Sequence, residues 1–205
     1  ARGRDRSDRL AGLAALRRRP VQRAIGIAAV SQGVMVFLMI PTPIAMIACG
    51  FTEDTAGDVI RWHIVAMFAP SFATGFLIQR IGANAIAIVG LATILVASVM
   101  AALGLSQLHF YGSLIVLGVG WNLSFIGATT LLAGELSDAE TAPVQGFNDT
   151  IIALVSTVCA FAAGMVISSF GWAVLAMVSG AIVLAGLVLM AFIRSETKVA
   201  GNGSL

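Results

Sequence analysis

Charged residues are nearly absent from the body of this chain. Only 11% of the 205 residues are Asp, Glu, Lys or Arg, and between Ala24 and Ile193 the only basic residues are Arg61 and Arg80. Soluble domains carry about 25% charged residues. A chain of this size must cover itself with polar side chains in water. The shortage of charge, together with 59% hydrophobic residues, therefore excludes an ordinary soluble domain and indicates a protein folded in lipid.

Cysteine is scarce as well, and the usual catalytic patterns are missing. Cys49 and Cys159 both lie in apolar runs, where they predict neither a disulfide framework nor a metal site. The sequence has no glycine-rich phosphate loop, no cluster of metal ligands and no nucleophile with a base at a meaningful spacing. We therefore expect the chain to be no enzyme and to hold no cofactor.

Long apolar runs are what the sequence has instead. A helix needs about 20 apolar residues to cross a bilayer. Six runs of this kind cover residues 24–49, 59–78, 83–103, 110–132, 145–167 and 172–193. The connections are short, and the longest is expected at residues 134–143. The predicted fold class is an all-α integral membrane protein with six transmembrane helices.

The basic residues gather at the start of the chain. Eight of the 12 Lys and Arg residues fall within residues 1–23. We interpret this stretch as a cytoplasmic arm held near anionic lipid, in preference to a nucleic-acid-binding segment. Because cytoplasmic loops carry the excess of Lys and Arg, both chain ends are expected in the cytoplasm. The expected regions are the arm, a transmembrane domain at residues 24–194 and a cytoplasmic tail at residues 195–205.

Polar side chains inside the predicted spans are candidates for a substrate pathway, because they are costly in lipid. Asn122, Phe125 and Thr129 share one face of the fourth span, next to Trp121. Gln32 lies about a third of the way across the first span. For Asn122 the alternative is a hydrogen bond that holds two helices together, and for Trp121 the alternative is packing.

Two further features concern the helix backbone and its contacts. Pro41 and Pro43 remove backbone donors late in the first span, so we expect a break there, which either borders a cavity or bends the helix for packing. Ser71 and Thr74 lie one turn apart in the second span and are expected to fix the bundle by hydrogen bonds.

Two titratable residues lie near the ends of the spans. His63 is expected to anchor the outer mouth of the second span together with Trp62, although a pH-sensitive gate is the other interpretation. Asp149 is the one acidic residue placed inside a predicted helix, about four residues from the cytoplasmic start of the fifth span. A proton-carrying carboxylate usually lies deeper, where burial raises its pKa. We therefore expect Asp149 to latch the cytoplasmic side through an ion pair or a helix-end contact.

The turn after the second span carries a family pattern. It reads Gly75-Phe76-Leu77-Ile78-Gln79-Arg80-Ile81-Gly82. This resembles a degenerate copy of the loop motif of the major facilitator superfamily, Gly-x-Leu-x-Asp-Arg-x-Gly, with Gln79 in place of the Asp. Weakened copies are typical of the second half of these transporters. Residues 62–75, 118–122 and 145–149 resemble the eighth, tenth and eleventh helices of bacterial members, so the resemblance covers essentially the whole chain.

The resemblance implies the C-terminal six-helix half of a secondary transporter, built from two inverted three-helix repeats. A small-molecule substrate would cross the cytoplasmic (inner) membrane by alternating access, bound between two halves. The implied partner is the N-terminal six-helix half or a second membrane subunit, and no nucleic acid. The resemblance also makes coupling to protons plausible, and because no deep carboxylate is present here, the coupling residue would belong to the other half.

The resemblance also implies roles for residues at the cytoplasmic side. By analogy with the family's charge clamp, Arg80 between Gly75 and Gly82 would pair with Glu135, and Asp149 would face the loop motif of the other half. A second class of function remains open, namely a non-transporting structural or assembly subunit of a larger membrane complex. Such a subunit would have Asn122 pressed against another helix, whereas a transporter would expose it to a water-filled cavity.

Overall fold

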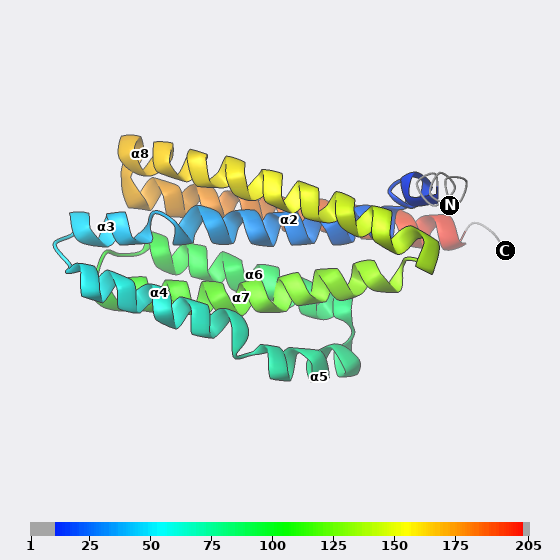
Figure 1. Ribbon diagram of the computed structural model, residues 1–205, viewed down its shortest axis with the longest axis horizontal. Helices are drawn as coiled ribbons and strands as arrows, with labels where there is room; N and C mark the ends of the chain where they lie inside the picture. The colour runs from blue at the N-terminus through cyan, green and yellow to red at the C-terminus, as the bar shows by residue number, and fades with distance from the viewer. Residues whose placement is uncertain (1–10, 203–205) are drawn as a thin grey trace.

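The computed structural model describes residues 11–202, with side chains described as far as residue 191, and in this part every regular element is an α-helix. The helices are α2 (Arg19–Met39), α3 (Thr42–Ala48), α4 (Glu53–Phe68), α5 (Ser71–Ile81), α6 (Ala83–Ala102), α7 (Gln107–Gly134) and α8 (Asp138–Asn202). They run side by side along the long axis of the molecule, apart from α5, which lies away from the bundle (Figure 1).

Five helical stretches of the described chain are long and apolar enough to cross a membrane. They are Arg19–Ala48, Glu53–Ile81, Ala83–Ala102, Gln107–Gly134 and Asp138–Ala191. The last stretch, within α8, contains two helices that meet at Gly171, where φ is 79° and ψ is −178°. Only glycine adopts this backbone conformation readily, so the chain turns back there. We call residues 138–170 the first arm of α8 and residues 172–191 the second arm.

The predicted break late in the first span is confirmed. Helix α2 ends at Met39 and α3 begins at Thr42, with Pro41 between them. Proline has no N–H and cannot continue the hydrogen-bond ladder of a helix. The Thr42 hydroxyl donates to the Leu38 carbonyl oxygen over 2.7 Å, so this backbone acceptor keeps a partner at membrane depth.

The second span differs from the prediction of one helix over residues 59–78. It starts at Glu53, because the Thr52 side chain accepts a hydrogen bond from the Thr55 N–H over 3.2 Å and caps the helix. It then breaks between Phe68 and Ser71, at Ala69 and Pro70. Hydropathy alone detects neither feature, because the cap is polar and the break lies inside an apolar run.

The connection between α7 and α8 is short, and the prediction of a long loop at residues 134–143 is wrong. Only residues 135–137 separate the two helices. The Ser137 N–H donates to Glu140 Oε2 over 2.9 Å, which is one of the two hydrogen bonds of a Ser-x-x-Glu capping box and lets the helix begin early. The Arg18 guanidinium also donates to Glu140 Oε2, over 2.7 Å, so the basic segment before α2 is tied to this corner.

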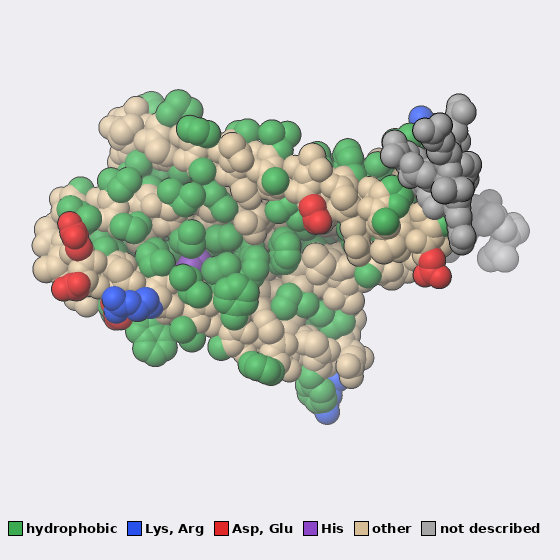
Figure 2. Space-filling view, in the orientation of Figure 1, with side chains coloured by type: hydrophobic (Ala, Val, Ile, Leu, Met, Phe, Trp, Pro, Cys, Tyr) green, Lys and Arg blue, Asp and Glu red, His purple; other side chains and the backbone are tan. Residues whose placement is uncertain are grey.

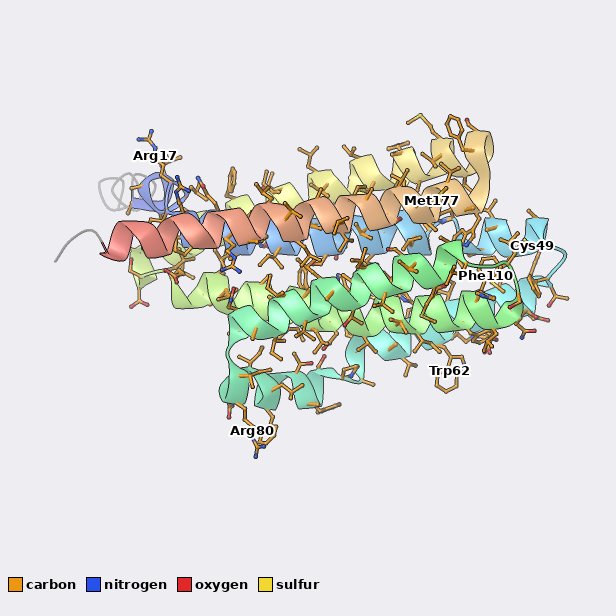
Figure 3. All side chains as sticks on the ribbon, turned by 180° about the vertical axis from the view of Figure 1, so that it is seen from behind. Arg17, Cys49, Trp62, Arg80, Phe110 and Met177 are labelled. Atoms are coloured by element: carbon orange, nitrogen blue, oxygen red, sulfur yellow. The ribbon has the colours of Figure 1, made fainter. Side chains whose placement is uncertain are left out.

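Two faces of the bundle follow from this arrangement. Figure 1 looks onto the face where α2 lies between the first arm of α8 and α7, with α4 beyond α7. Figure 3, from behind, has α6 and the second arm of α8 in front. The predicted substrate-pathway residues belong to α2 and α7, and we describe the site from these helices and from α4, which packs on α7.

Candidate functional site

A line of polar contacts joins α4 to α7. The Tyr111 hydroxyl donates to Asp58 Oδ2 over 2.7 Å, and His63 Nδ1 lies 2.7 Å from the Leu114 carbonyl oxygen. A carbonyl only accepts, so His63 Nδ1 carries the proton of this bond. Further along, a Cβ atom added to Gly118 would lie 2.7 Å from the His63 carbonyl oxygen. The two helices therefore pack closely.

His63 is not the interfacial anchor that the sequence predicted. Its side chain is fully buried, and its Nε2 has no hydrogen-bond partner in the described structure. The neighbouring Trp62 is 51% exposed, so these consecutive residues lie on different sides of α4. The sequence pattern around residue 63 gave no sign of the partner, because the acceptor is a backbone carbonyl on another helix.

Asn122 of α7 occupies the break between α4 and α5. Its Nδ2 donates to the Met67 carbonyl oxygen and to Ser71 Oγ, both over 2.7 Å, and its Oδ1 accepts from Thr74 Oγ1 over 2.6 Å. In a continuous helix the Ser71 N–H would bond to the Met67 carbonyl oxygen. The Asn122 amide takes that place, so it satisfies a backbone acceptor that the break sets free.

This geometry settles where three predicted residues lie. Asn122 is 1% exposed and lies between helices, as the helix-bonding interpretation expected, and Thr74 is also fully buried. Ser71 and Thr74 make the bundle-fixing hydrogen bonds that we expected of them. Asn122 therefore holds the broken helix in this conformation and is not exposed on a cavity wall. This is the placement that we expected of a structural subunit, so Asn122 does not support the transporter interpretation.

Gln32, Trp121 and Phe125 come together where α2 meets α7. Trp121 Nε1 donates to Gln32 Oε1 over 2.8 Å. The Trp121 and Phe125 rings are stacked, with centroids 4.9 Å apart and planes at 15°. The Phe68 ring meets Trp121 edge to face, with centroids 6.2 Å apart. These side chains, with an amide among the rings, form what we call the aromatic cluster: Gln32, Phe68, Trp121 and Phe125.

Thr129 lies one turn beyond Phe125 on α7 and is half-buried. Its hydroxyl donates to the backbone oxygens of Phe125 and Ile126, over 3.0 and 3.1 Å. Hydroxyls that bond within their own helix lose little in lipid. Thr129 therefore adds no further polar link between helices.

The residues expected at the cytoplasmic clamp are not brought together. The Arg80 guanidinium lies 4.2 Å from the centroid of the Phe76 ring, and its side chain points away from the bundle (Figure 3). The Arg80–Glu135 pair is not formed in this structure, since the short helix α5 lies apart from the end of α7. Gly82 takes a positive φ of 86° at the turn, as its place in the motif predicts, whereas Gly75 has nothing near it to pack against.

Asp149 is exposed near the start of α8. Its Oδ1 accepts from the Nδ2 of the neighbouring Asn148 over 3.3 Å. An ion pair at this end of the bundle joins Arg18 to Glu140, over 2.7 Å. Sequence reasoning missed this pair, although the Ser137-x-x-Glu140 capping pattern was a readable signal for the position of Glu140.

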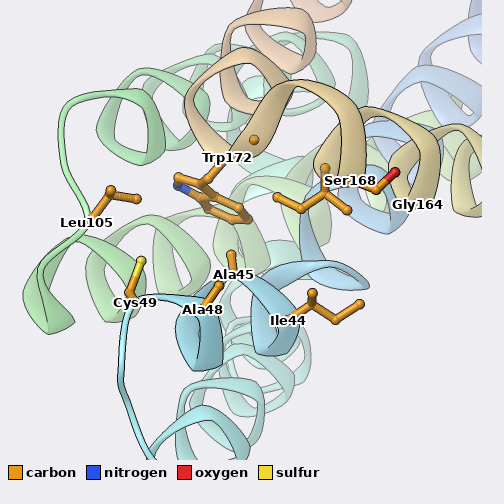
Figure 4. Close-up of a pocket in the computed structure, with 10 residues that line it drawn as sticks. Ile44, Ala45, Ala48, Cys49, Leu105, Gly164, Ser168 and Trp172 are labelled. Carbon is orange, nitrogen blue, oxygen red and sulfur yellow. The ribbon is translucent and has the colours of Figure 1, made fainter.

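A cavity of about 340 Å³ lies elsewhere, between α3 and the turn of α8 (Figure 4). It is lined by Ile44, Ala45, Ala48, Cys49, Leu105, Gly164, Ile167, Ser168, Gly171 and Trp172. The indole N–H of Trp172 is bonded to the Ala101 carbonyl oxygen over 2.8 Å, and the Ser168 hydroxyl to the Met165 carbonyl oxygen over 3.0 Å. The indole N–H and the hydroxyl hydrogen are thus already bonded, and none of the predicted pathway residues belongs to the lining.

The middle of the face in Figure 2 shows hydrophobic side chains with no Lys or Arg among them. Several large apolar side chains of α4 and the first arm of α8 are strongly exposed on these helices: Val65, Phe68, Leu154, Val158, Phe161 and Met165. Those on α8 recur at intervals of three, four or seven residues and so form one helical stripe. These surfaces suit lipid or another apolar protein surface, and not water.

Relatives of the chain are membrane transporters. A riboflavin transporter of Brucella anthropi is 43% identical over 142 residues, which are 69% of this chain and 36% of that protein. Two uncharacterized MFS-type transporters of Bacillus subtilis, YdeG and YddS, are 36% and 33% identical over 73% and 82% of the chain. No protein-family model matches the chain. The chain spans only 35–39% of the length of these three relatives.

Proposed function

We propose that this chain, which belongs to the major facilitator superfamily, forms the C-terminal half of a secondary transporter. Its relatives described above are transporters and not enzymes. The observation that carries this proposal is the 33–43% identity to such transporters over at least 69% of the chain. Because the chain matches about a third of each relative, the second wall of a transport pathway has to come from another six-helix unit.

The helices support a six-crossing topology. Four of the membrane-length stretches each supply one crossing, and the two arms of α8 supply two more because the chain turns back at Gly171. In the proposed arrangement these crossings form two inverted three-helix repeats, as in the family. The basic segment before α2 and the corner at Glu140 then lie in the cytoplasm, at the inner membrane, and the α3–α4 and α6–α7 turns lie outside.

The uncovered apolar face supports a partner half. Phe68, which belongs to the aromatic cluster, and Phe161 on α8 are 58% and 73% exposed. A second six-helix unit placed on this face would enclose Gln32 and Trp121 between the halves. In this proposal Gln32, Trp121 and Phe125 line the substrate pathway, with Thr129 toward its cytoplasmic end, while Asn122 holds the wall together from behind.

The transported solute is a small molecule, and the named substrate of the Brucella relative makes riboflavin the first compound to test. Alternating access would move it across the membrane, with the two halves rocking about the bound solute. Coupling to protons would use a carboxylate of the other half, because the described spans hold no deep Asp or Glu next to the aromatic cluster. The cytoplasmic latch is assigned to Asp149, with Arg80 facing the partner half.

Two measurements on the native protein test the proposal. The intact mass should be about that of a full two-half transporter, or the chain should co-purify in mild detergent with one stoichiometric six-helix partner. Proteoliposomes loaded with unlabelled riboflavin should take up labelled riboflavin by exchange, with protein-free liposomes as the control. A native chain of about 21 kDa held only among unrelated subunits, with no solute exchange, would instead support the structural-subunit alternative.

A further inference from the structure

The Gln32 side chain combines a fixed orientation with free donors. An indole N–H only donates, so the atom of Gln32 that lies 2.8 Å from Trp121 Nε1 is the amide oxygen. With its oxygen held, the amide turns its Nε2 to the other side. No group in the described part of the chain accepts a hydrogen bond from this nitrogen. An amide left with two free donors inside a membrane span is costly unless water or a ligand takes them.

Aromatic rings from two helices lie beside this amide. Trp121 is half-buried and stacks on Phe125, and Phe68, which is 58% exposed, stands at the edge of the indole. Stacked and edge-to-face rings hold one another in place, so the cluster is a rigid surface. Rigid aromatic surfaces favour flat ligands, because a flat ring covers the largest area at the smallest entropy cost.

Charge is missing from the segments of α2, α4, α5 and α7 that hold or adjoin the cluster, whereas the neighbouring first arm of α8 carries Asp149 nearer its start. Helix α2 has no charged residue after Arg23, the α4–α5 pair has none between Arg61 and Arg80, and α7 has none along its length. A charged group placed here would have no counter-ion within these segments and would pay a high desolvation cost. The part of a ligand that contacts this half is therefore uncharged.

We propose that the aromatic cluster binds an uncharged planar heteroaromatic ring that carries a carbonyl acceptor at its edge, as flavins, pteridines and oxopurines do. The ring lies against Trp121 and its carbonyl oxygen accepts from Gln32 Nε2. Phe68 limits the space at the edge of the indole. This inference rests on the proposed function, since the other half closes the site.

The test uses the purified full-length transporter that contains this chain, in detergent, with riboflavin as the probe and its fluorescence as the readout. Gln32→Leu should weaken riboflavin binding roughly five- to tenfold, which corresponds to one hydrogen bond. Trp121→Leu should weaken it about tenfold or more, and Trp121→Phe should have an intermediate effect because a ring remains but the N–H is lost. Trp62→Leu and Gln107→Leu are the matched controls and should bind as the unmodified protein does.

A second comparison tests the charge requirement and keeps the two proposals apart. Flavin mononucleotide has the flavin ring of riboflavin and an added phosphate, and a neutral sugar has no aromatic ring. Lumichrome is a neutral flavin-like ring without the ribityl side chain. Lumichrome should compete with riboflavin better than flavin mononucleotide or the sugar does. The inference is overturned if the Gln32→Leu and Trp121→Leu variants elute as folded protein and bind riboflavin as tightly as the unmodified protein does. It is also overturned if only sugars compete with riboflavin. Solute exchange without ring binding would refute this site and leave the transporter proposal standing. Gln32-dependent ring binding without any exchange would support the site and refute transport.

Discussion

Glycine sets how closely α6 and α7 approach. A Cβ atom added to Gly90 would collide with the backbone of Ser124, and one added to Gly127 would lie 2.7 Å from the Ala87 nitrogen. In lipid there is little hydrophobic drive between helices, so close backbone packing supplies much of the association energy. The contact therefore tolerates no side chain at these two positions.

Gly90→Ala is the direct test of this close contact. The added methyl group meets backbone that cannot move aside. We therefore expect the free energy of unfolding to fall by about 1–3 kcal/mol, as for overpacked cores. Gly164→Ala is the matched control, because nothing lies within 4 Å of a Cβ atom at that position. Thermal unfolding in detergent should show a clear drop in midpoint for the first variant alone. Equal midpoints would contradict the packing described for α6 and α7.

Asp149 offers a second test at the scale of one residue. Asp149→Asn keeps the shape of the side chain and removes the charge that we assign to the cytoplasmic latch. We expect a shift in the balance of inward- and outward-facing states. It should change the transport kinetics and the labelling rate of a cysteine introduced at either end of the first arm of α8. Asp138→Asn, also on α8 but in its exposed first turn, should leave both unchanged. If Asp149→Asn behaves like that control, the latch is wrong.

The broken pair α4–α5 is the element whose shape depends most on one distant side chain. Asn122 bonds to residues on both sides of the break, Met67 before it and Ser71 and Thr74 after it. Thr74 is the one buried residue of α5, so little else ties this helix to the bundle. The position of α5 is therefore set by hydrogen bonds more than by apolar packing.

Asn122→Ala should release α5. The change leaves the Met67 carbonyl oxygen and the Ser71 hydroxyl without their Asn122 partner, whereas the Thr74 hydroxyl keeps the Pro70 carbonyl oxygen as an acceptor. We expect a cost of about 1–3 kcal/mol. Trypsin should then cut faster after Arg80, which lies in the last turn of α5. Thr130→Val on the same helix is the control, because the Thr130 hydroxyl bonds only to the Ile126 carbonyl oxygen of its own helix. Unchanged cleavage at Arg80 in the Asn122 variant would show that Asn122 does not hold α5.

The same element shows how far the sequence could lead. Apolar run length predicted α6 within one residue and Pro41 predicted the first break, because both signals are local. The break at Pro70 was not predicted. A proline within an apolar run shows that one backbone bond is lost, but the partner that stabilises the break is Asn122, 52 residues later in the sequence.

The candidate site was predictable in part for the same reason. The sequence singled out Gln32, Trp121 and Phe125 as candidates, and the structure brings these three side chains together. Their union into one cluster depends on the register of α2 against α7, which no local pattern specifies. The Arg80–Glu135 pair came from analogy with the family, and the short helix α5 separates its members in this structure.

At the scale of the whole molecule, the proposed function explains the exposed apolar side chains and the short match to longer relatives together. In this proposal a second six-helix unit covers part of the apolar surface and completes the transporter. If the halves then rock about a bound solute, the two ends of the same face must open in turn. The first arm of α8 has exposed side chains toward each end, Phe147 and Met165 at 44% and 65%.

The most direct test is reciprocal labelling at these two positions in the full-length protein, after Cys49 and Cys159 have been replaced by Ser. Phe147→Cys reports the cytoplasmic end and Met165→Cys the outer end. Alternating access predicts that any condition that raises the labelling rate at one cysteine, such as added solute or Asp149→Asn, lowers it at the other. Rates that rise and fall together, or that never change with solute, would contradict the assignment of this chain as half of an alternating-access transporter.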